Sequence, residues 1–96
     1  MYLEIITPEQ TLFQGEISSA IFPGKNGSFQ VLKDHAPIIA MLGEGHIKMR
    51  LADQTRKLDA ASGRVVLDTS DDSSYNVELE QGVVEMKNNN IIVLVN

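Results

Sequence analysis

The stretch SFQVLKDHAPIIAML, residues 28–42, decides the fold because two apolar runs flank one polar corner. Both runs, FQVL and PIIAML, are rich in side chains that favour strands. Lys33 and Asp34 interrupt the pattern, and Pro37 favours an extended backbone at the residue before it. We therefore predict two buried strands that meet at a polar corner.

Strand signals continue on both sides of this stretch, separated by glycine, proline and asparagine. Gly15 permits a bend, and Pro23-Gly24 and Asn26-Gly27 are both dipeptides that favour tight turns. Many short strands joined by such turns predict an all-β sandwich or barrel. The other expected strands cover residues 2–6, 12–13, 17–22, 45–51, 76–80, 82–86 and 90–95. The last two are joined by the polar link Lys87-Asn88-Asn89, whose asparagines tolerate positive φ.

Two of these segments alternate cleanly between apolar and charged side chains. In residues 45–51 the basic side chains share one face of the strand, and in residues 76–80 the outward side chains are acidic. We expect the two strands to lie side by side, so that a basic row pairs with an acidic row.

The chain has 96 residues, which is the length of one domain, and we predict a single β-sandwich domain over residues 1–96. Residues 52–75 form its least regular part, an extended connection. Residues 56–61 and 64–67 are candidate short strands within it, and DTSDDSS, residues 68–74, is typical of a mobile polar loop.

Composition and charge exclude several classes of function. A net charge of −5 disfavours binding to nucleic acid and to anionic lipid, both of which require basic side chains. The longest apolar runs are far shorter than the roughly 20 residues of a spanning helix, and the first residues lack the features of a secretory signal. We therefore expect no direct insertion into a membrane. The absence of cysteine excludes disulfides and thiolate metal sites.

Candidate catalytic and ligand-binding residues are few. Asp34-His35 is the one pair that could belong to a catalytic site, but no nucleophile motif accompanies it, so a structural or interface role is favoured. Asp68, Asp71 and Asp72 could supply oxygen ligands for calcium, yet their spacing fails the EF-hand pattern. No glycine-rich phosphate-binding motif occurs. We therefore expect no catalytic residue, no metal site and no cofactor.

Four stretches together resemble the N-terminal domain of the epsilon subunit of F-type ATP synthases. The resemblance lies in TPEQTLFQGEI (7–17), FPGKNGSFQVLKDHAPIIAML (22–42), the glycine and strand at 45–49, and GVVEMKNNNIIVLV (82–95). It implies a two-sheet antiparallel β-sandwich in the rotating central stalk of a proton-translocating ATP synthase. Such a subunit is non-catalytic and couples ion flow to ATP synthesis, at the cytoplasmic face of the bacterial inner membrane as a peripheral protein.

The same resemblance implies two partners and places them on the chain. The gamma subunit would meet the edge formed by Thr7, Pro8 and Leu12. The c-ring would meet the end that carries Ser28, Lys33, Asp34 and His35. Family members often carry an acidic residue at the position of Ser28. Many also continue past the position of Asn96 into a C-terminal helical hairpin, so we expect a short form without that regulatory arm.

Two other classes of function stay open. A free-standing β-sandwich binding module for carbohydrate or metal ions would use the acidic loop at residues 68–72. Such a module needs exposed aromatic side chains or a complete set of ligands. A small hydrolase that uses His35 is the third possibility.

Overall fold

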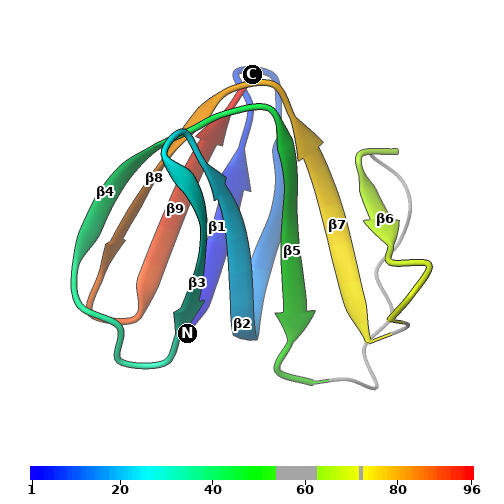
Figure 1. Ribbon diagram of the computed structural model, residues 1–96. Helices are drawn as coiled ribbons and strands as arrows, with labels where there is room; N and C mark the ends of the chain where they lie inside the picture. The colour runs from blue at the N-terminus through cyan, green and yellow to red at the C-terminus, as the bar shows by residue number, and fades with distance from the viewer. Residues whose placement is uncertain (54–62, 72) are drawn as a thin grey trace.

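The chain folds into β-strands arranged in two layers (Figure 1). The structure is a computed structural model and describes residues 1–53, 63–71 and 73–96. None of these residues is helical, so this part of the chain contains no helix that could cross a membrane. The strands are β1 (Tyr2–Ile6), β2 (Thr11–Gly24), β3 (Gly27–Leu32), β4 (Ile38–Leu42), β5 (Gly45–Leu51), β6 (Val65–Leu67), β7 (Ser74–Leu79), β8 (Gly82–Lys87) and β9 (Asn90–Val95).

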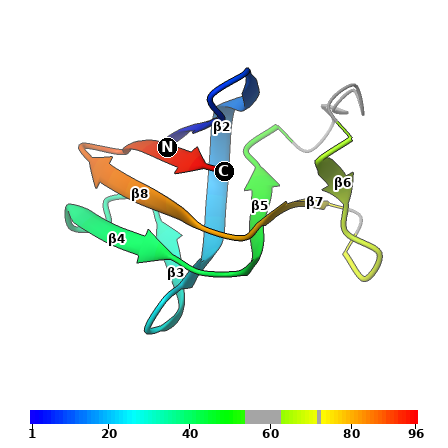
Figure 2. The ribbon, with the colours of Figure 1, turned by 90° about the horizontal axis from the view of Figure 1, so that it is seen from above.

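The long strand β2 belongs to both layers (Figures 1 and 2). Its first half pairs with β1, and its second half lies between β3 and β5. The strand continues through Gly15, and an irregularity between Ile17 and Ser19 marks its passage from one layer to the other. One layer therefore runs β2-β1-β9-β8-β4, and the other runs β3-β2-β5-β7-β6.

The predicted β-sandwich is confirmed, with one correction to its strand directions. Strands β1 and β9 run parallel, while the other paired strands run antiparallel, so the sheet is mixed. The predicted hairpin between β8 and β9 is also confirmed. Its turn residues Asn88 and Asn89 have φ of 53° and 61°, the left-handed values that asparagine tolerates and that a type I′ turn requires.

The core lies between the two layers and consists mainly of aliphatic side chains. Strands alternate, so that every second side chain points inward. Phe22 is buried and packs against the partly buried Phe29, with ring centroids 5.6 Å apart. The largest fully buried side chains are Phe22, Leu3, Ile5, Ile17, Leu42, Ile47, Met49, Leu51, Leu79, Met86, Ile91 and Val31.

The expectation that both strands beside the polar corner are buried is wrong for the outward face of each: only Val31 of β3 and Leu42 of β4 are fully buried, and Leu32 is 51% exposed. Ile39 is 77% exposed and Met41 is 58% exposed, whereas Leu42 is fully buried. A strand in one layer of a sandwich has only one face toward the core, so an uninterrupted apolar run leaves alternate side chains on the outer surface.

The expected turn at Pro23-Gly24 is also wrong. Both residues belong to β2, and the turn consists of Lys25 and Asn26, which join the paired residues Gly24 and Gly27. Pairing of β2 with β5 ends at Ile21, so the missing N–H of Pro23 disrupts no bond there.

The predicted neighbours β5 and β7 do pair, but their charged rows match at one position only. His46 lies opposite Glu78, with 3.9 Å between Nε2 and Oε2. Lys48 and Arg50 lie opposite Asn76 and Ser74. Their acidic partners come instead from the loop before β7, as described below.

In the connection at 52–75, β6 confirms the second candidate short strand. The first candidate, residues 56–61, and the acidic residue Asp72 lie outside the described residues.

Candidate functional site

The polar corner between β3 and β4 projects from one end of the sandwich. Lys33, Asp34 and His35 are all exposed. Asp34 has a φ of 65°, in the left-handed region that aspartate tolerates better than most residues. The N–H of His35 donates to the carbonyl of Leu32 at 3.1 Å, which closes a tight turn. The corner therefore presents two cationic or ionisable side chains on a turn of defined shape.

Asn89, from the β8–β9 turn, holds this corner in place. Its Oδ1 accepts a hydrogen bond from the Asp34 N–H at 2.7 Å, and its Nδ2 donates to Asp34 Oδ1 at 2.9 Å. The Asn89 carbonyl also accepts from the N–H of Tyr2 at 2.9 Å, at the start of β1. Three segments distant in sequence are thereby fastened at one end of the molecule.

The side chains of Asp34 and His35 have separate partners. The Asp34 carboxylate bonds to Asn89, while His35 Nδ1 lies 2.7 Å from the carbonyl oxygen of Ala36. Because a carbonyl oxygen only accepts, Nδ1 carries the hydrogen in this contact, and Nε2 is the ring atom available to a partner. The arrangement suits recognition at a surface rather than a catalytic pair.

Ser28 does not join this corner. It pairs with Pro23 near the start of β3, whereas Lys33 follows the end of that strand. Five residues of extended chain separate the two positions by roughly 16 Å. A contact that includes both must run along the outward face of β3, over the exposed Gln30 and Leu32.

The turn at Thr7, Pro8 and Leu12 lies at the opposite end of β1 from Asn89 (Figure 1). Thr7 is buried, and its Oγ1 accepts from the N–H groups of Glu9 and Gln10 at 3.3 and 3.0 Å and donates to the Gln10 carbonyl at 3.0 Å. Leu12 is a core side chain, and Pro8 is exposed. Pro8 is therefore the member of this set that a partner could contact, and the hydrogen bonds of Thr7 fix the conformation of the turn.

The described part of the acidic loop is bonded internally. Asp68 Oδ1 accepts from the N–H and the hydroxyl of Ser70, both at 2.8 Å, and Lys48 Nζ lies 3.6 Å from Oδ2. The Ser70 hydrogen bonds, with smaller contributions from the Asn76 side chain and Lys48, lower the pKa of Asp68 to about 2.

Asp71 has the same environment. Its Oδ1 accepts from the hydroxyl and N–H of Ser73 at 2.6 and 3.1 Å, and its Oδ2 contacts Ser74 Oγ and Arg50. The Ser73 hydroxyl, the Ser73 N–H and Ser74, with Arg50, lower the pKa of Asp71 to about 2. Both carboxylates serve the fold, and among the residues described no group of three His, Asp or Glu side chains could hold a metal ion.

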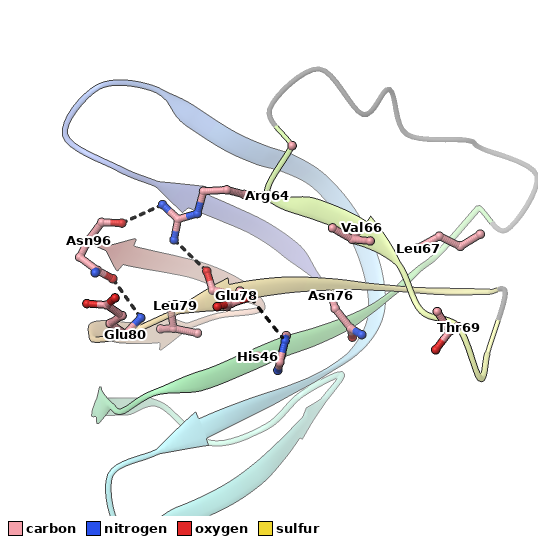
Figure 3. Close-up of a pocket in the computed structure, with 11 residues that line it drawn as sticks. His46, Arg64, Val66, Leu67, Thr69, Asn76, Glu78, Leu79, Glu80 and Asn96 are labelled. Carbon is pink, nitrogen blue, oxygen red and sulfur yellow. Dashed lines mark hydrogen bonds and ion pairs between the residues drawn. The ribbon is translucent and has the colours of Figure 1, made fainter.

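A hollow beside β6 and β7 is lined by both apolar and polar side chains, and several of the polar ones are bonded within the chain (Figure 3). The Arg64 guanidinium donates to the carbonyls of Asn96 and Glu78 at 2.7 and 2.8 Å. Asn96 Oδ1 accepts from the N–H groups of Glu80 and Gln81, both at 3.2 Å. These bonds fasten the ends of β6, β7 and β9 together, which is a structural role.

Two features of the surface were not predicted. The first is the bond between Asn89 and Asp34, which are 55 positions apart in the sequence. The sequence indicates that Asn89 lies in a turn but not that the turn contacts the corner. The exposed apolar side chains of β4 and β9 could have been inferred from their uninterrupted apolar runs, since a sandwich strand has one outer face.

The strands and their pairing define an all-β domain of the sandwich class. The sequence model of the family described as ATP synthase, Delta/Epsilon chain, beta-sandwich domain matches residues 1–65. The chain belongs to this family.

Individual relatives agree with this membership. The chain is 51% identical over 53 residues to the ATP synthase epsilon chain of Chlorobaculum tepidum, covering 55% of this chain and 60% of that one. It is 29% identical over 92 residues to the epsilon chain of Leptospira borgpetersenii, covering 96% of this chain and 58% of that one. The chain thus spans about three fifths of the length of the curated relatives it matches.

A solved structure shares the fold. The central stalk and c-ring structure of the Tetrahymena thermophila mitochondrial ATP synthase contains a chain that matches with a TM-score of 0.69 at 13% identity. The match covers 99% of this chain and 62% of that chain.

Proposed function

We propose that this chain acts in a non-catalytic rotor subunit of the central stalk of a proton-translocating ATP synthase. It binds the gamma subunit and the c-ring and couples ion flow to ATP synthesis. It works as a peripheral protein at the cytoplasmic face of the bacterial membrane. Membership of the epsilon family supports this assignment.

The observation that carries the proposal is the bridge between the corner and Asn89. A subunit that transmits torque needs contact surfaces that do not shift under load. The two hydrogen bonds at 2.7 and 2.9 Å fasten the corner to the β8–β9 turn. Lys33 and His35, on either side of Asp34, are thereby offered to a polar c-subunit loop from a backbone that loses little freedom on binding. In this proposal Ser28 extends the c-ring contact along β3.

The gamma contact is proposed at the other end of β1. There the buried Thr7 hydroxyl and the core side chain of Leu12 shape a turn that exposes Pro8. The two proposed contacts are separated by the length of β1, so the sandwich can act as a brace between two partners.

The test is ATP-driven proton pumping in membranes that lack the native subunit and receive the purified chain. Asp34→Lys and His35→Ala are expected to restore pumping less well than the wild type, while both variants keep the circular dichroism spectrum of the folded domain. Glu44→Ala, an exposed change away from the corner, is the matched control. Full restoration by both corner variants would overturn the c-ring assignment.

A further inference from the structure

We propose that β3 is a site of self-association, where the open edges of two copies of this chain pair as antiparallel strands. The strand, Gly27–Leu32, lies at the edge of the β3-β2-β5-β7-β6 layer and pairs with β2 alone. Such pairing is a property of the free chain, goes beyond the proposed function and does not depend on it.

The pairing of β3 with β2 determines which backbone groups of β3 point to the open edge. A two-residue turn joins Gly24 and Gly27, so this closing pair is hydrogen bonded, and bonded pairs recur at every second residue of an antiparallel ladder. The residues whose N–H and carbonyl groups point away from β2 are therefore Ser28, Gln30 and Leu32.

Bonds to neighbouring segments agree with this assignment. Pro23, opposite Ser28, has no N–H to donate, and its carbonyl accepts from the N–H of Gly43 at 2.8 Å instead of facing β3. The carbonyl of Leu32 accepts from the N–H of His35 at 3.1 Å. Within the described part of the chain, the backbone groups of Ser28 and Gln30 have no hydrogen-bond partner, because β3 has no second neighbouring strand.

The edge of β3 lacks the features that usually prevent strands from pairing between molecules. Protected edge strands are very short, or carry a charge, a proline or a bulge. Residues 27–32, GSFQVL, contain no charged side chain and no proline, and they pair with β2 without a shift of register. Leu32 is also 51% exposed. The strand therefore presents a neutral and regular edge to solvent.

Two other sheet edges are better protected and provide an internal comparison. β6, at the opposite edge of the same layer, has only three residues. β4, at the edge of the other layer, is closed at its end by β2 and the turn that follows it. There Leu42 pairs with Gly24, and the N–H of Lys25 donates to the carbonyl of Met41 at 3.0 Å. Of these three edges, β3 has the longest unprotected one.

The outward groups of β3 match those of a second copy. They are spaced evenly about Gln30, so a two-fold axis beside Gln30 places Ser28 of each copy opposite Leu32 of the other. All three residues of each copy then exchange backbone hydrogen bonds, about six in total. No paired position carries a charge, so the strands meet without like charges in contact although each chain has a net charge of −5.

A second copy fits this edge better than a segment of another protein. Strands added to a sheet edge gain specificity from pockets that take alternate side chains of the added strand. The hollow beside β6 and β7 includes no residue of β3, and neither does the smaller hollow lined by Pro37 and Lys87. What β3 offers is a symmetric row of backbone groups, which a second copy matches in full.

The length of the edge predicts a weak dimer. Six residues of strand extend over about 20 Å, and their pairing buries far less than the roughly 800 Å² per partner of a standard interface. We expect a dissociation constant between about 10 µM and 1 mM. The dimer covers Ser28, so under the proposed function it must separate before the chain contacts the c-ring along β3.

The experiment is sedimentation equilibrium of the purified full chain from about 5 µM to about 1 mM. The average mass should rise from that of one chain toward that of two. Gln30→Pro removes the central outward N–H, which β2 does not use, and should weaken dimerisation at least about tenfold. Gln30→Thr keeps that N–H and is the matched control, which should dimerise like the wild type.

A second variant tests the same contact without changing the backbone. Gln30→Lys places like charges opposite each other across the two-fold axis, so dimerisation should weaken at low salt and recover in about 0.5 M salt. Circular dichroism confirms that each variant is folded.

Amide hydrogen exchange, measured by NMR at low and high protein concentration, locates the contact. The N–H groups of Ser28, Gln30 and Leu32 should exchange more slowly at high concentration. Those of Phe29 and Val31, which bond to β2, should be protected at both concentrations.

Three results would overturn the proposal. They are a chain that remains monomeric at about 1 mM, a dimer that Gln30→Pro leaves intact, and a dimer in which exchange slows elsewhere than in β3. No other subunit takes part in these measurements, so their failure leaves the stalk assignment standing. Failure of the chain to bind gamma would in turn leave the self-association standing.

Discussion

Asn89 holds Asp34 through two hydrogen bonds, one to its backbone N–H at 2.7 Å and one to its carboxylate at 2.9 Å. Both residues have left-handed backbone conformations, with φ of 61° and 65°. Left-handed backbone conformations are less favourable for non-glycine residues, and the two hydrogen bonds help to offset this cost at both positions. They fasten the corner between β3 and β4 to the β8–β9 turn.

Replacing Asn89 with alanine should reduce the free energy of unfolding by about 1–3 kcal/mol, because both hydrogen bonds are lost and alanine disfavours positive φ. Asn89→Gly removes the same bonds but adopts positive φ readily, so its loss should be smaller. Urea denaturation measures both values. Equal stability of Asn89→Ala and the wild type would show that the bridge contributes nothing.

The Thr7 hydroxyl should be needed for the turn between β1 and β2. Thr7→Val keeps the shape of the side chain but leaves the N–H groups of Glu9 and Gln10 without this acceptor, at an expected cost of about 1–3 kcal/mol. Thr7→Ser retains the oxygen and should lose less. If valine is as stable as serine in urea denaturation, the hydrogen bonds do not stabilise the turn.

Asp71 should make stability depend on pH in the acid range. Its folded pKa of about 2 lies below the ordinary value of 3.8, so its contribution is present above about pH 4 and is lost as the pH falls toward 2. The difference in free energy of unfolding between wild type and Asp71→Asn should therefore be largest above pH 4 and shrink toward pH 2. A difference that stays constant from pH 6 to pH 2 would contradict this. Glu80→Gln, at an exposed side chain, is the control.

Replacement by alanine should destabilise the domain at Gly24 but not at Gly43. At Gly24 an added Cβ would lie 2.6 Å from the Gly27 carbonyl oxygen and 3.0 Å from the Phe29 ring, so we expect a loss of more than about 1 kcal/mol. At Gly43 the nearest atom is 3.6 Å away, and stability should change by less than about 1 kcal/mol. Thermal unfolding compares the two, and a tolerated Gly24→Ala would contradict the close approach.

Much of the fold was predictable because local patterns and tertiary packing agree. Residues 45–51 alternate strictly, and β5 has those bounds with Ile47, Met49 and Leu51 buried. The asparagine turn at 88–89 was predictable for the same reason, since few other residues tolerate positive φ at two successive positions.

Other features depend on contacts that local patterns do not contain. Pro23-Gly24 favours a turn locally, but pairing with Ser28 and Gly27 keeps both residues in β2 and moves the turn to Lys25-Asn26. The partners of Lys48 and Arg50 come from a loop rather than from the facing strand. The corner itself was predictable, whereas its attachment to Asn89 required the fold.

The most direct test of the stalk assignment is co-purification of the chain with the gamma subunit from its own source, followed by sizing of the product. The assignment predicts a stable one-to-one complex that elutes ahead of either component. Separate elution of the two proteins, while circular dichroism shows the chain to be a folded β-domain, would contradict it.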